Sequence, residues 1–272
     1  LGQYKLVQLL GRGGMGEVYE AKHTTLDRHY ALKLLPSEFS GRPDALERLR
    51  REARVMAHLH HPNIIKVDDF GETPSAGSGQ AGRCWLRMEL ASGGICNGVR
   101  IRSLEQFIQA EDSRLDPSEA HVVFAQILDG LAYAHNRGVV HRDLKPANIL
   151  VSTTRGGRAA FKISDFGLVR VMGEDWVRTQ VDQSVRLSMS MGNMETDAAQ
   201  SKDSASTQSM IGTYEYMSPE QKRGEEATPA SDVYAVGLMM YRLLTGRHLG
   251  PRPPSYYVPE LAVWDNVTSA AA

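Results

Sequence analysis

The chain has 272 residues, of which 31 are basic and 32 acidic, so its net charge is −1. This balance excludes the strong overall field that favours nucleic acid or an anionic membrane, and any anion-binding site must be local. The length suits one large domain or two lobes that share a cleft. The only cysteines, Cys84 and Cys96, are too few for a disulfide framework or a four-ligand zinc site, so we interpret both as inert thiols.

The sequence offers no membrane-spanning or targeting segment. No run approaches the roughly 18 apolar residues of a membrane helix, and no charged, then apolar, leader stands at the start. We therefore expect a cytoplasmic domain that contacts neither membrane nor nucleic acid within this window. Any membrane anchor would lie outside it.

The first 35 residues predict three strands around a cluster of glycines. Apolar residues alternate over 4–10, glycines follow over 11–16, and strand-forming residues resume over 17–21 and 30–35. A helix should begin near Pro43.

The apolar stripe of this predicted helix contains a carboxylate. Ala45, Leu49 and Met56 form the stripe, with Leu59 beyond them, and Glu52 falls on the same side. A carboxylate on an inward face needs a partner.

Strands and helices alternate over the next part of the chain. Two strands should flank the loop 73–83, and the spacing of Ser103 and Gln106 predicts a capping box and a short helix. A longer helix should open at 116–119 and stop at Gly138. We assign it the apolar face Val122, Ala125, Leu128, Leu131 and Ala132.

The last third combines an irregular segment with one clear helix. Residues 171–210 are rich in Ser, Thr and Met without apolar periodicity, so we expect this segment to be mobile. A helix should run from Thr228 to Gly246. Its predicted apolar residues are Val233, Val236, Leu238 and Leu243, and a further helix should begin near Ala262.

Two short motifs, 141–148 and 165–167, carry the groups that phosphoryl transfer needs. Asp143 can accept a proton from a substrate hydroxyl, and Asn148 and Asp165 can ligate Mg²⁺. Lys145 can neutralise charge on the moving phosphoryl group. Each of these residues alone would more often be structural, so the argument depends on the set.

A glycine-rich turn and an apolar strand that ends in lysine precede these motifs. The spacing G-x-G-x-x-G-x-V over 11–18 lets backbone N–H groups approach phosphate oxygens. A plain hairpin turn or a dinucleotide-binding fold can show the same spacing, but the latter has a helix where a strand is predicted here. Lys33 alone would be a surface lysine, whereas an inward Glu52 can pair with it.

Together these motifs resemble the signature of the protein kinases, in particular the bacterial, eukaryotic-like (Hanks-type) Ser/Thr kinases. The resemblance covers residues from about 4 to 250. Its motifs occur in the family's order: the glycine loop, 30–33 with Lys33, Glu52, 141–148, 165–167, 218–220 and 231–234.

The resemblance implies an α+β, bilobal protein-kinase fold. A small antiparallel β-sheet N-lobe with one major helix would span 1–90, and a mainly helical C-lobe would span 91–272. A long activation segment would occupy 168–217, and residues 92–102 would be an insertion after the hinge. The C-terminal helices of the large lobe would be missing, with the arginine that normally pairs with the glutamate at position 220. Glu220 would then be unpaired and destabilising.

The resemblance also implies roles for individual residues. Asp143 would be the base, Lys145 would touch the γ-phosphate, and Asn148 and Asp165 would hold Mg²⁺ or, alternatively, Mn²⁺. Lys33, fixed by Glu52, would hold the α- and β-phosphates of ATP beneath Gly11, Gly13, Gly14 and Gly16. Val18, Ala31 and Leu150 would enclose adenine, although ordinary core packing explains them as well. Met88 would be the gatekeeper, with Glu89 and Ala91 as hinge contacts.

Substrate class and regulation follow from the same resemblance. Lys145 and Thr213 are typical of Ser/Thr rather than tyrosine kinases, and Thr213 would bond Asp143 and Lys145. Arg142 implies control by phosphorylation of the activation segment. The candidate phosphosites are Thr207, Ser204, Ser206 and Ser209.

The predicted enzyme is therefore an ATP- and Mg²⁺-dependent Ser/Thr protein kinase that acts on protein hydroxyls, with a possible homodimer for trans-autophosphorylation. One alternative is a nucleotide-binding pseudokinase or scaffold that is inactive because its C-lobe is shortened. Pseudokinases usually lose the equivalents of Lys33, Asp143 or Asp165, and all three are present. A small-molecule phosphotransferase is disfavoured by the segment 213–220, which shapes a peptide site.

Overall fold

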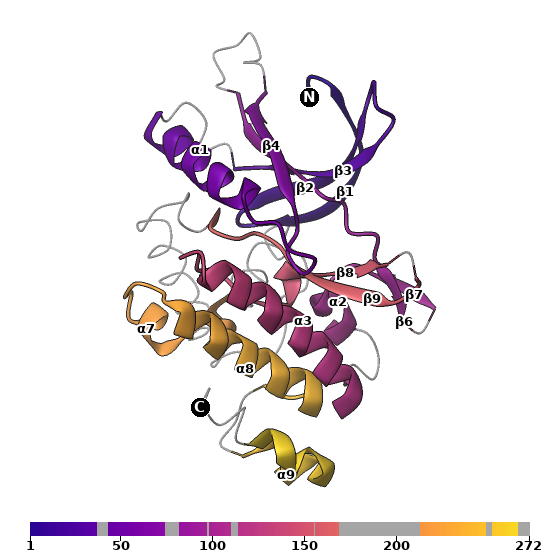
Figure 1. Cartoon of the computed structure of the whole chain (residues 1–272), viewed down its shortest axis with the longest axis vertical. Helices are drawn as coiled ribbons and strands as arrows, with labels where there is room; N and C mark the ends of the chain where they lie inside the picture. The colour runs from indigo at the N-terminus through magenta and orange to yellow at the C-terminus, as the bar shows by residue number, and fades with distance from the viewer. Residues whose placement is uncertain are drawn as a thin grey trace, which may run out of the picture. The chain divides into compact units, whose positions relative to one another are not determined.

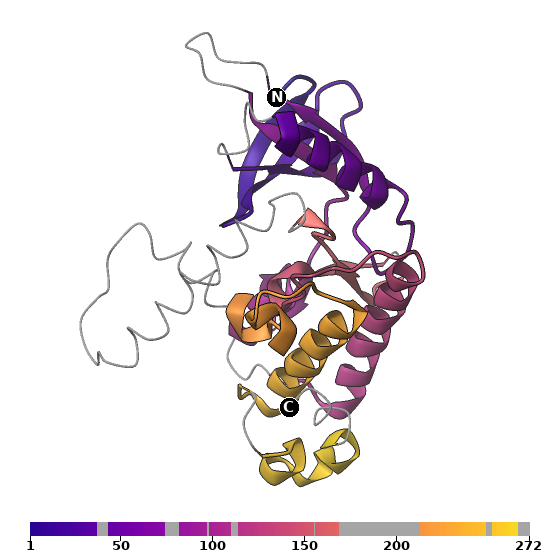
Figure 2. The same ribbon diagram turned by 90° about the vertical axis from the view of Figure 1, so that its left-hand side faces the viewer.

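The computed structural model describes residues 1–36, 43–73, 82–96, 98–109, 114–154, 156–168, 213–248 and 252–265, with the side chains of 43–45 left out. The chain divides into two compact units (Figures 1 and 2). The first comprises Leu1–His60, Lys66–Leu90 and Gly167–Glu215, and the second comprises His61–Ile65, Ala91–Phe166 and Tyr216–Ala272. The assignment of these units as kinase lobes with the predicted boundaries stays a prediction.

The first unit is a twisted antiparallel sheet with one helix. The strands follow the order β1-β2-β3-β5-β4, and α1 lies against β4 (Figure 1). Their bounds are β1 Tyr4–Gly13, β2 Gly16–His23, β3 His29–Leu34, α1 Pro43–Ala57, β4 Val67–Glu72 and β5 Cys84–Met88. The three early strands, the helix at Pro43 and the two strands around 73–83 are confirmed.

The sheet buries different residue types on its two faces, because successive side chains of a strand point in opposite directions. One face carries an apolar cluster of Tyr4, Ala21, Leu32 and Leu34. On the other face Lys33 lies opposite Val18 and Leu86, and Ala31 opposite Met88. The strand register therefore gathers the predicted nucleotide-binding side chains on one side of the sheet.

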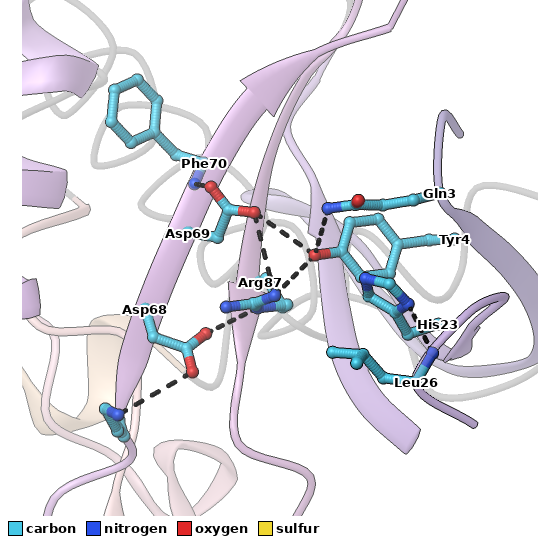
Figure 3. Close-up of polar contacts among 9 residues, drawn as sticks. Gln3, Tyr4, His23, Leu26, Asp68, Asp69, Phe70 and Arg87 are labelled. Carbon is cyan, nitrogen blue, oxygen red and sulfur yellow. Dashed lines mark hydrogen bonds and ion pairs between the residues drawn. The ribbon is translucent and has the colours of Figure 1, made fainter. Parts of the chain in front are cut away.

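Arg87 on β5 connects β4 and β5 to Tyr4 at the start of β1, on the face that carries the apolar cluster (Figure 3). Its guanidinium donates to Asp68 Oδ1 at 2.7 Å and to the Tyr4 hydroxyl at 2.6 Å. The same group lies 4.7 Å from the centre of the Tyr30 ring. The Tyr4 hydroxyl in turn donates to Asp69 at 3.3 Å. This network joins β1 to β4 and β5 and leaves the Lys33 face clear of those groups.

The second unit combines helices with two short hairpins. Its elements are β6 Gly94–Cys96, β7 Val99–Ile101, α2 Leu104–Gln109, α3 Pro117–His135, η2 Pro146–Asn148, β8 Ile149–Thr153, β9 Ala159–Ile163, α7 Pro219–Lys222, α8 Pro229–Thr245, α9 Pro254–Tyr257 and η3 Pro259–Trp264. Helices α3 and α8 lie side by side in both views. The predicted insertion after the hinge forms the β6–β7 hairpin, which packs on β8.

The predicted helix starts agree with the structure. Asp116 caps α3 by accepting from the N–H groups of Ser118 and Glu119, and Glu119 returns a bond to the N–H of Asp116. At α2 the N–H of Gln106 donates to Ser103, but the Gln106 side chain accepts from Arg102 instead of Ser103. This helix is thus capped by a shifted version of the predicted box.

Two sequence assignments were wrong. The face of α3 that packs inward contains Ala120, Val123, Phe124, Ile127, Leu131 and Ala134, while Val122 is 51% and Leu128 42% exposed. Apolar residues occur all around this helix, so the stripe was placed one residue off. Val233 on α8 is likewise exposed. The further helix predicted near Ala262 begins within the 3₁₀ segment η3, and its continuation beyond residue 265 lies outside the described residues.

Gly130 explains how closely α3 approaches the loop that carries Asn63. A Cβ added at Gly130 would lie 3.0 Å from the Asn63 carbonyl oxygen. Asn63 Nδ2 donates to Gln126 of α3 and to the Phe161 carbonyl of β9, at 2.9 Å each.

Within the described ranges, no helix is both long and apolar enough to cross a bilayer.

The glycine-rich turn provides a test of the sheet geometry. Gly16 has φ +112°, and a Cβ there would lie 2.1 Å from the Leu34 carbonyl oxygen, whereas one at Gly11 would meet nothing within 4 Å. We expect Gly16→Ala to lower the free energy of unfolding by roughly 2 to 4 kcal/mol through strain and overlap. Gly11→Ala should change it by less than about 1 kcal/mol. Urea unfolding curves measure both, and equal midpoints for the two variants would contradict this geometry.

Candidate active site

The β8–β9 hairpin brings the two predicted metal ligands to one place. Ile149 pairs with Ile163, so Asn148 immediately precedes β8 where Ser164 and Asp165 immediately follow β9. The N–H and hydroxyl groups of Ser164 donate to the Asn148 carbonyl, at 2.8 and 3.1 Å. The strand register therefore holds Asn148 and Asp165 at the same end of the hairpin.

Asp143 lies beside Lys145 and Asn148. Its Oδ2 atom is 3.0 Å from Lys145 Nζ and accepts from Asn148 Nδ2 at 3.3 Å, while the same amide donates to the Asp143 carbonyl at 2.7 Å. The Asp143 carboxylate is 4% exposed. Because both contacts fall on Oδ2, Oδ1 is the oxygen left to accept a proton from a hydroxyl.

The chemistry of Asn148 fits a magnesium site. Its Nδ2 group points at Asp143, so its Oδ1 is the atom that remains for a cation. An amide oxygen and a carboxylate are hard oxygen ligands of the kind that Mg²⁺ takes, together with water and substrate phosphates. In the part of the chain that the structure describes, there is no cluster of three or more His, Cys, Asp or Glu side chains suited to a metal.

His141 hydrogen-bonds both to the loop that carries Asp143 and to the segment that carries Asp165. Its Nδ1 accepts from the Asp143 N–H at 3.2 Å, and its Nε2 bonds the Ser164 carbonyl at 2.7 Å. These partners require the tautomer with the proton on Nε2. The ring is fully buried and lies 4.8 Å from the Phe166 ring. His141 thus fixes the distance between the Asp143 loop and the segment that carries Asp165.

The residues 141–145, which include Asp143, are called the predicted catalytic loop, or catalytic loop for short. Asp232, in the first turn of α8, anchors the backbone of this loop. Its Oδ2 accepts from the His141 N–H at 2.8 Å and its Oδ1 from the Arg142 N–H at 2.9 Å. His135, the last residue of α3, bonds Oδ2 at 2.8 Å. Asp232 is 2% exposed, so these bonds offset the cost of burying its charge.

Arg142 is held at three points. Its N–H donates to Asp232 Oδ1, its carbonyl accepts from Gln221 Nε2 at 2.7 Å, and its guanidinium pairs with Glu226 at 3.1 Å. Its backbone has φ +74°. The guanidinium is largely covered, whereas Glu226 is 77% exposed. The predicted phosphate-binding arginine therefore has a weak carboxylate partner from the loop before α8.

The first unit places the predicted nucleotide-binding residues on β2, β3 and β5. Lys33 is 3% and Glu52 is 7% exposed, so both charges are buried within the same unit. Their ion pair stays a prediction. A Cβ at Gly167, whose φ is +67°, would lie 3.1 Å from Glu52 Oε2, so the glycine after Phe166 makes room for this carboxylate.

The glycine loop is the β1–β2 hairpin. Gly13 pairs with Gly16 across the turn at Gly14 and Met15, and Gly11 pairs with Val18. Gly16 is required by its approach to Leu34, independently of any ligand. Met88 is buried at the end of β5, next to Ala31 on β3.

The hinge residues differ in what they can offer. The Glu89 N–H donates to the Lys66 carbonyl at 2.9 Å, so in a backbone hydrogen bond with adenine the Glu89 carbonyl oxygen would be the acceptor. Ala91 is buried, and Leu150 is half-buried on β8, both in the second unit. Their predicted contacts with adenine remain untested.

The expectation that Glu220 is unpaired was wrong. Glu220 Oε1 accepts from the Ser231 hydroxyl at 2.5 Å. This hydrogen bond is the main cause that lowers the pKa of Glu220 below its usual value. The partner is a hydroxyl eleven residues further on, and no local pattern predicts it.

Several predicted residues are only partly described. Thr213 is half-buried in the helical turn 213–216. The candidate phosphosites Thr207, Ser204, Ser206 and Ser209 lie outside the described residues. Sequence reasoning missed His135 and Gln221, which support the catalytic loop from distant positions. The sequence carries no local signal for either contact.

Comparison with known proteins agrees with this geometry. The sequence model of the protein kinase domain family matches residues 4–188 and 194–256. The serine/threonine-protein kinase PknA of Mycobacterium tuberculosis is 37% identical over 246 residues, which cover 90% of this chain and 47% of that protein. The serine/threonine-protein kinase PrkC of Bacillus subtilis is 32% identical, over 90% of this chain and 31% of its own.

Solved structures give the same result. The crystal structure of the Mycobacterium tuberculosis PknI kinase domain matches with a TM-score of 0.64 and 26% identity, over 99% of this chain and 87% of that one. The chain spans less than half the length of the curated relatives named above. The chain belongs to the protein kinase domain family, with bacterial Ser/Thr kinases among its relatives.

Proposed function

We propose that this domain transfers the γ-phosphoryl group of ATP to serine or threonine hydroxyls of proteins. The observation that carries the proposal is the arrangement of Asp143 with Lys145 and Asn148 on one of its carboxylate oxygens. It leaves one oxygen of a fixed carboxylate for an incoming hydroxyl. General base catalysis of this kind typically contributes about 10² to 10⁴ in rate.

Residues of the second unit would each have a separate role in phosphoryl transfer. Asp143 orients the acceptor hydroxyl and takes its proton, and Lys145 stabilises negative charge that develops on the transferred group. Asn148 Oδ1 and Asp165 would hold Mg²⁺, or Mn²⁺ in its place. When bound, the metal neutralises charge on the phosphates. The protein itself contributes positions fixed by the hairpin, by His141 and by Asp232.

The residues of the first unit would bind the nucleotide. Backbone N–H groups of the β1–β2 turn can approach phosphate oxygens because Gly13, Gly14 and Gly16 carry no side chains. Lys33 would reach the α- and β-phosphates with Glu52 as its partner. Val18, Ala31 and Met88 share the Lys33 face of the sheet and would form an apolar surface for adenine.

The choice of serine and threonine follows from Lys145, Thr213 and the named functions of the relatives PknA and PrkC. Nothing favours the pseudokinase alternative, since Lys33, Asp143 and Asp165 are all retained. A cytoplasmic location and a homodimer that phosphorylates itself in trans are part of the proposal and rest on the family resemblance.

Phosphorylation of a generic protein substrate with labelled ATP and Mg²⁺ tests the proposal. Asp143→Asn should reduce kcat at least about 100-fold, because an amide cannot accept the proton. Lys33→Met should also lose most activity, and removal of divalent metal with EDTA should abolish it until Mg²⁺ or Mn²⁺ is restored. Circular dichroism controls for folding. Equal phosphate incorporation by the wild type and both variants would contradict the assigned roles.

We further propose that phosphorylation of the activation segment regulates the domain through Arg142. The guanidinium pairs with Glu226, an exposed carboxylate, and exposed ion pairs contribute only about 0.2 to 1 kcal/mol. A phosphate group forms stronger, bidentate hydrogen bonds with arginine. Glu226 would therefore occupy Arg142 until a phosphate displaces it. The candidates for that phosphate are Thr207, Ser204, Ser206 and Ser209.

Two neighbouring glutamates allow a matched test of this regulation. Glu226 pairs with Arg142, whereas Glu225 pairs with Arg223 at 2.7 Å. In phosphatase-treated protein, Glu226→Gln should increase the rate at which phenylglyoxal modifies Arg142 by roughly two- to fivefold, and Glu225→Gln should not. Peptide mass spectrometry measures the rates. After incubation with ATP and Mg²⁺, phosphate should map between residues 171 and 213. A chain without phosphate there, or equal rates in both variants, would rule the mechanism out.

A further inference from the structure

The residue before the proposed base has a backbone conformation that needs support. Arg142 has φ +74°, a region that costs a residue with a side chain on the order of 1 kcal/mol or more. Asp232 holds the N–H of Arg142, and Gln221 Nε2 holds its carbonyl at 2.7 Å. Both hydrogen-bonding groups of this backbone unit are therefore occupied by side chains that come from the segment around α7 and α8.

Gln221 has partners on both atoms of its amide. Its Nε2 donates to the Arg142 carbonyl, while its Oε1 accepts from the N–H and the hydroxyl of Ser218, at 3.2 Å each. A backbone N–H only donates and a carbonyl only accepts, so only one orientation of the amide satisfies both sides. Gln221 is thus fixed between the start of α7 and the catalytic loop.

The contact fixes the peptide plane that leads into Asp143. The carbonyl of Arg142 and the N–H of Asp143 belong to the same planar peptide unit. Gln221 holds the carbonyl end, and His141 Nδ1 accepts from the N–H end at 3.2 Å. Because both ends are held, the peptide unit cannot rotate, and the direction in which it leads to the Cα of Asp143 is fixed. The orientation of the Asp143 carboxylate follows from it.

On its other side, Gln221 reaches the segment before α7. Ser218 is fully buried and lies within 213–220, the stretch in which the kinase resemblance locates the peptide-binding site. The Gln221 amide therefore connects the backbone of that stretch to the backbone beside the proposed base. A shift at either end is transmitted through a hydrogen bond of 2.7 Å.

We infer that Gln221 is a positioning residue for phosphoryl transfer, which sets the peptide plane between Arg142 and Asp143 and couples it to Ser218. The inference rests on the proposed function. Gln221 does not touch the reacting atoms and acts through the Arg142 carbonyl. The simpler role for Gln221 is to cap α7 through Oε1 alone, and the experiment must separate the two.

Gln221→Glu separates them because it changes only one end of the side chain. A carboxylate still accepts from the Ser218 N–H and hydroxyl, and it suits the N-terminal turn of a helix. It cannot donate to the Arg142 carbonyl, and it places negative charge against that oxygen. Gln221→Met removes both hydrogen bonds at similar length. Gln109→Glu, on the exposed end of α2, makes the same charge change away from the site.

Steady-state kinetics and thermal unfolding are measured for the wild type and the three variants. We expect Gln221→Glu to keep a cooperative unfolding transition and the wild-type KM for ATP while its kcat falls roughly 10- to 100-fold, as displacements of about 1 Å do. Gln221→Met should lose kcat and some Tm, and Gln109→Glu should match the wild type. A wild-type kcat for Gln221→Glu would assign Gln221 to capping alone and overturn the inference.

Hydrogen exchange tests the inference without turnover. The Asp143 amide should exchange several-fold faster in Gln221→Glu, because the far end of its peptide unit is released, and at the wild-type rate in Gln109→Glu. Unchanged exchange in Gln221→Glu would overturn the positioning role even if the enzyme is active. Absence of phosphoryl transfer by the wild type would instead contradict the proposed function, so the two failures are distinguishable.

Discussion

A single buried carboxylate, Asp232, organises the candidate active site. It accepts hydrogen bonds from the backbone of His141 and Arg142 and from the ring of His135. These donors come from α3 and from the catalytic loop, while Asp232 belongs to α8. Burial of the charge is tolerable because each oxygen has strong donors. Without it, two backbone N–H groups would be buried without a partner and the loop would lose its fixed shape.

The rest of the site extends this anchor by short steps. His141 connects the catalytic loop to the Ser164 carbonyl through a hydrogen bond. The register of β8 and β9 places Asn148 beside Ser164 and Asp165. Gln221 and Glu226 hold the backbone and side chain of Arg142 from one connecting segment. The residues predicted to bind the nucleotide are organised separately, by the register of a sheet whose opposite face is covered by Arg87 and aromatic rings.

Much of this architecture could be predicted from local signals in the sequence. The glycine turn, the cap at Asp116 and the Gly246 stop are short-range patterns, and they fall where elements begin or end. The face of α3 could not be predicted, because a helix with apolar residues on all sides has no single stripe. The partners of Glu220 and Arg142 could not be predicted either. Those contacts join residues far apart in the sequence, and only the tertiary structure selects them.

We expect Asp232 to hold Asp143 ready for phosphoryl transfer through the loop backbone. The most direct measurement is the kcat of Asp232→Asn with ATP and Mg²⁺, with KM for ATP and circular dichroism as controls. An amide presents a donor where the loop N–H groups require an acceptor, so we predict a loss of roughly 100-fold or more in kcat with nucleotide binding retained. A folded Asp232→Asn protein that turns over at the wild-type rate would contradict the account.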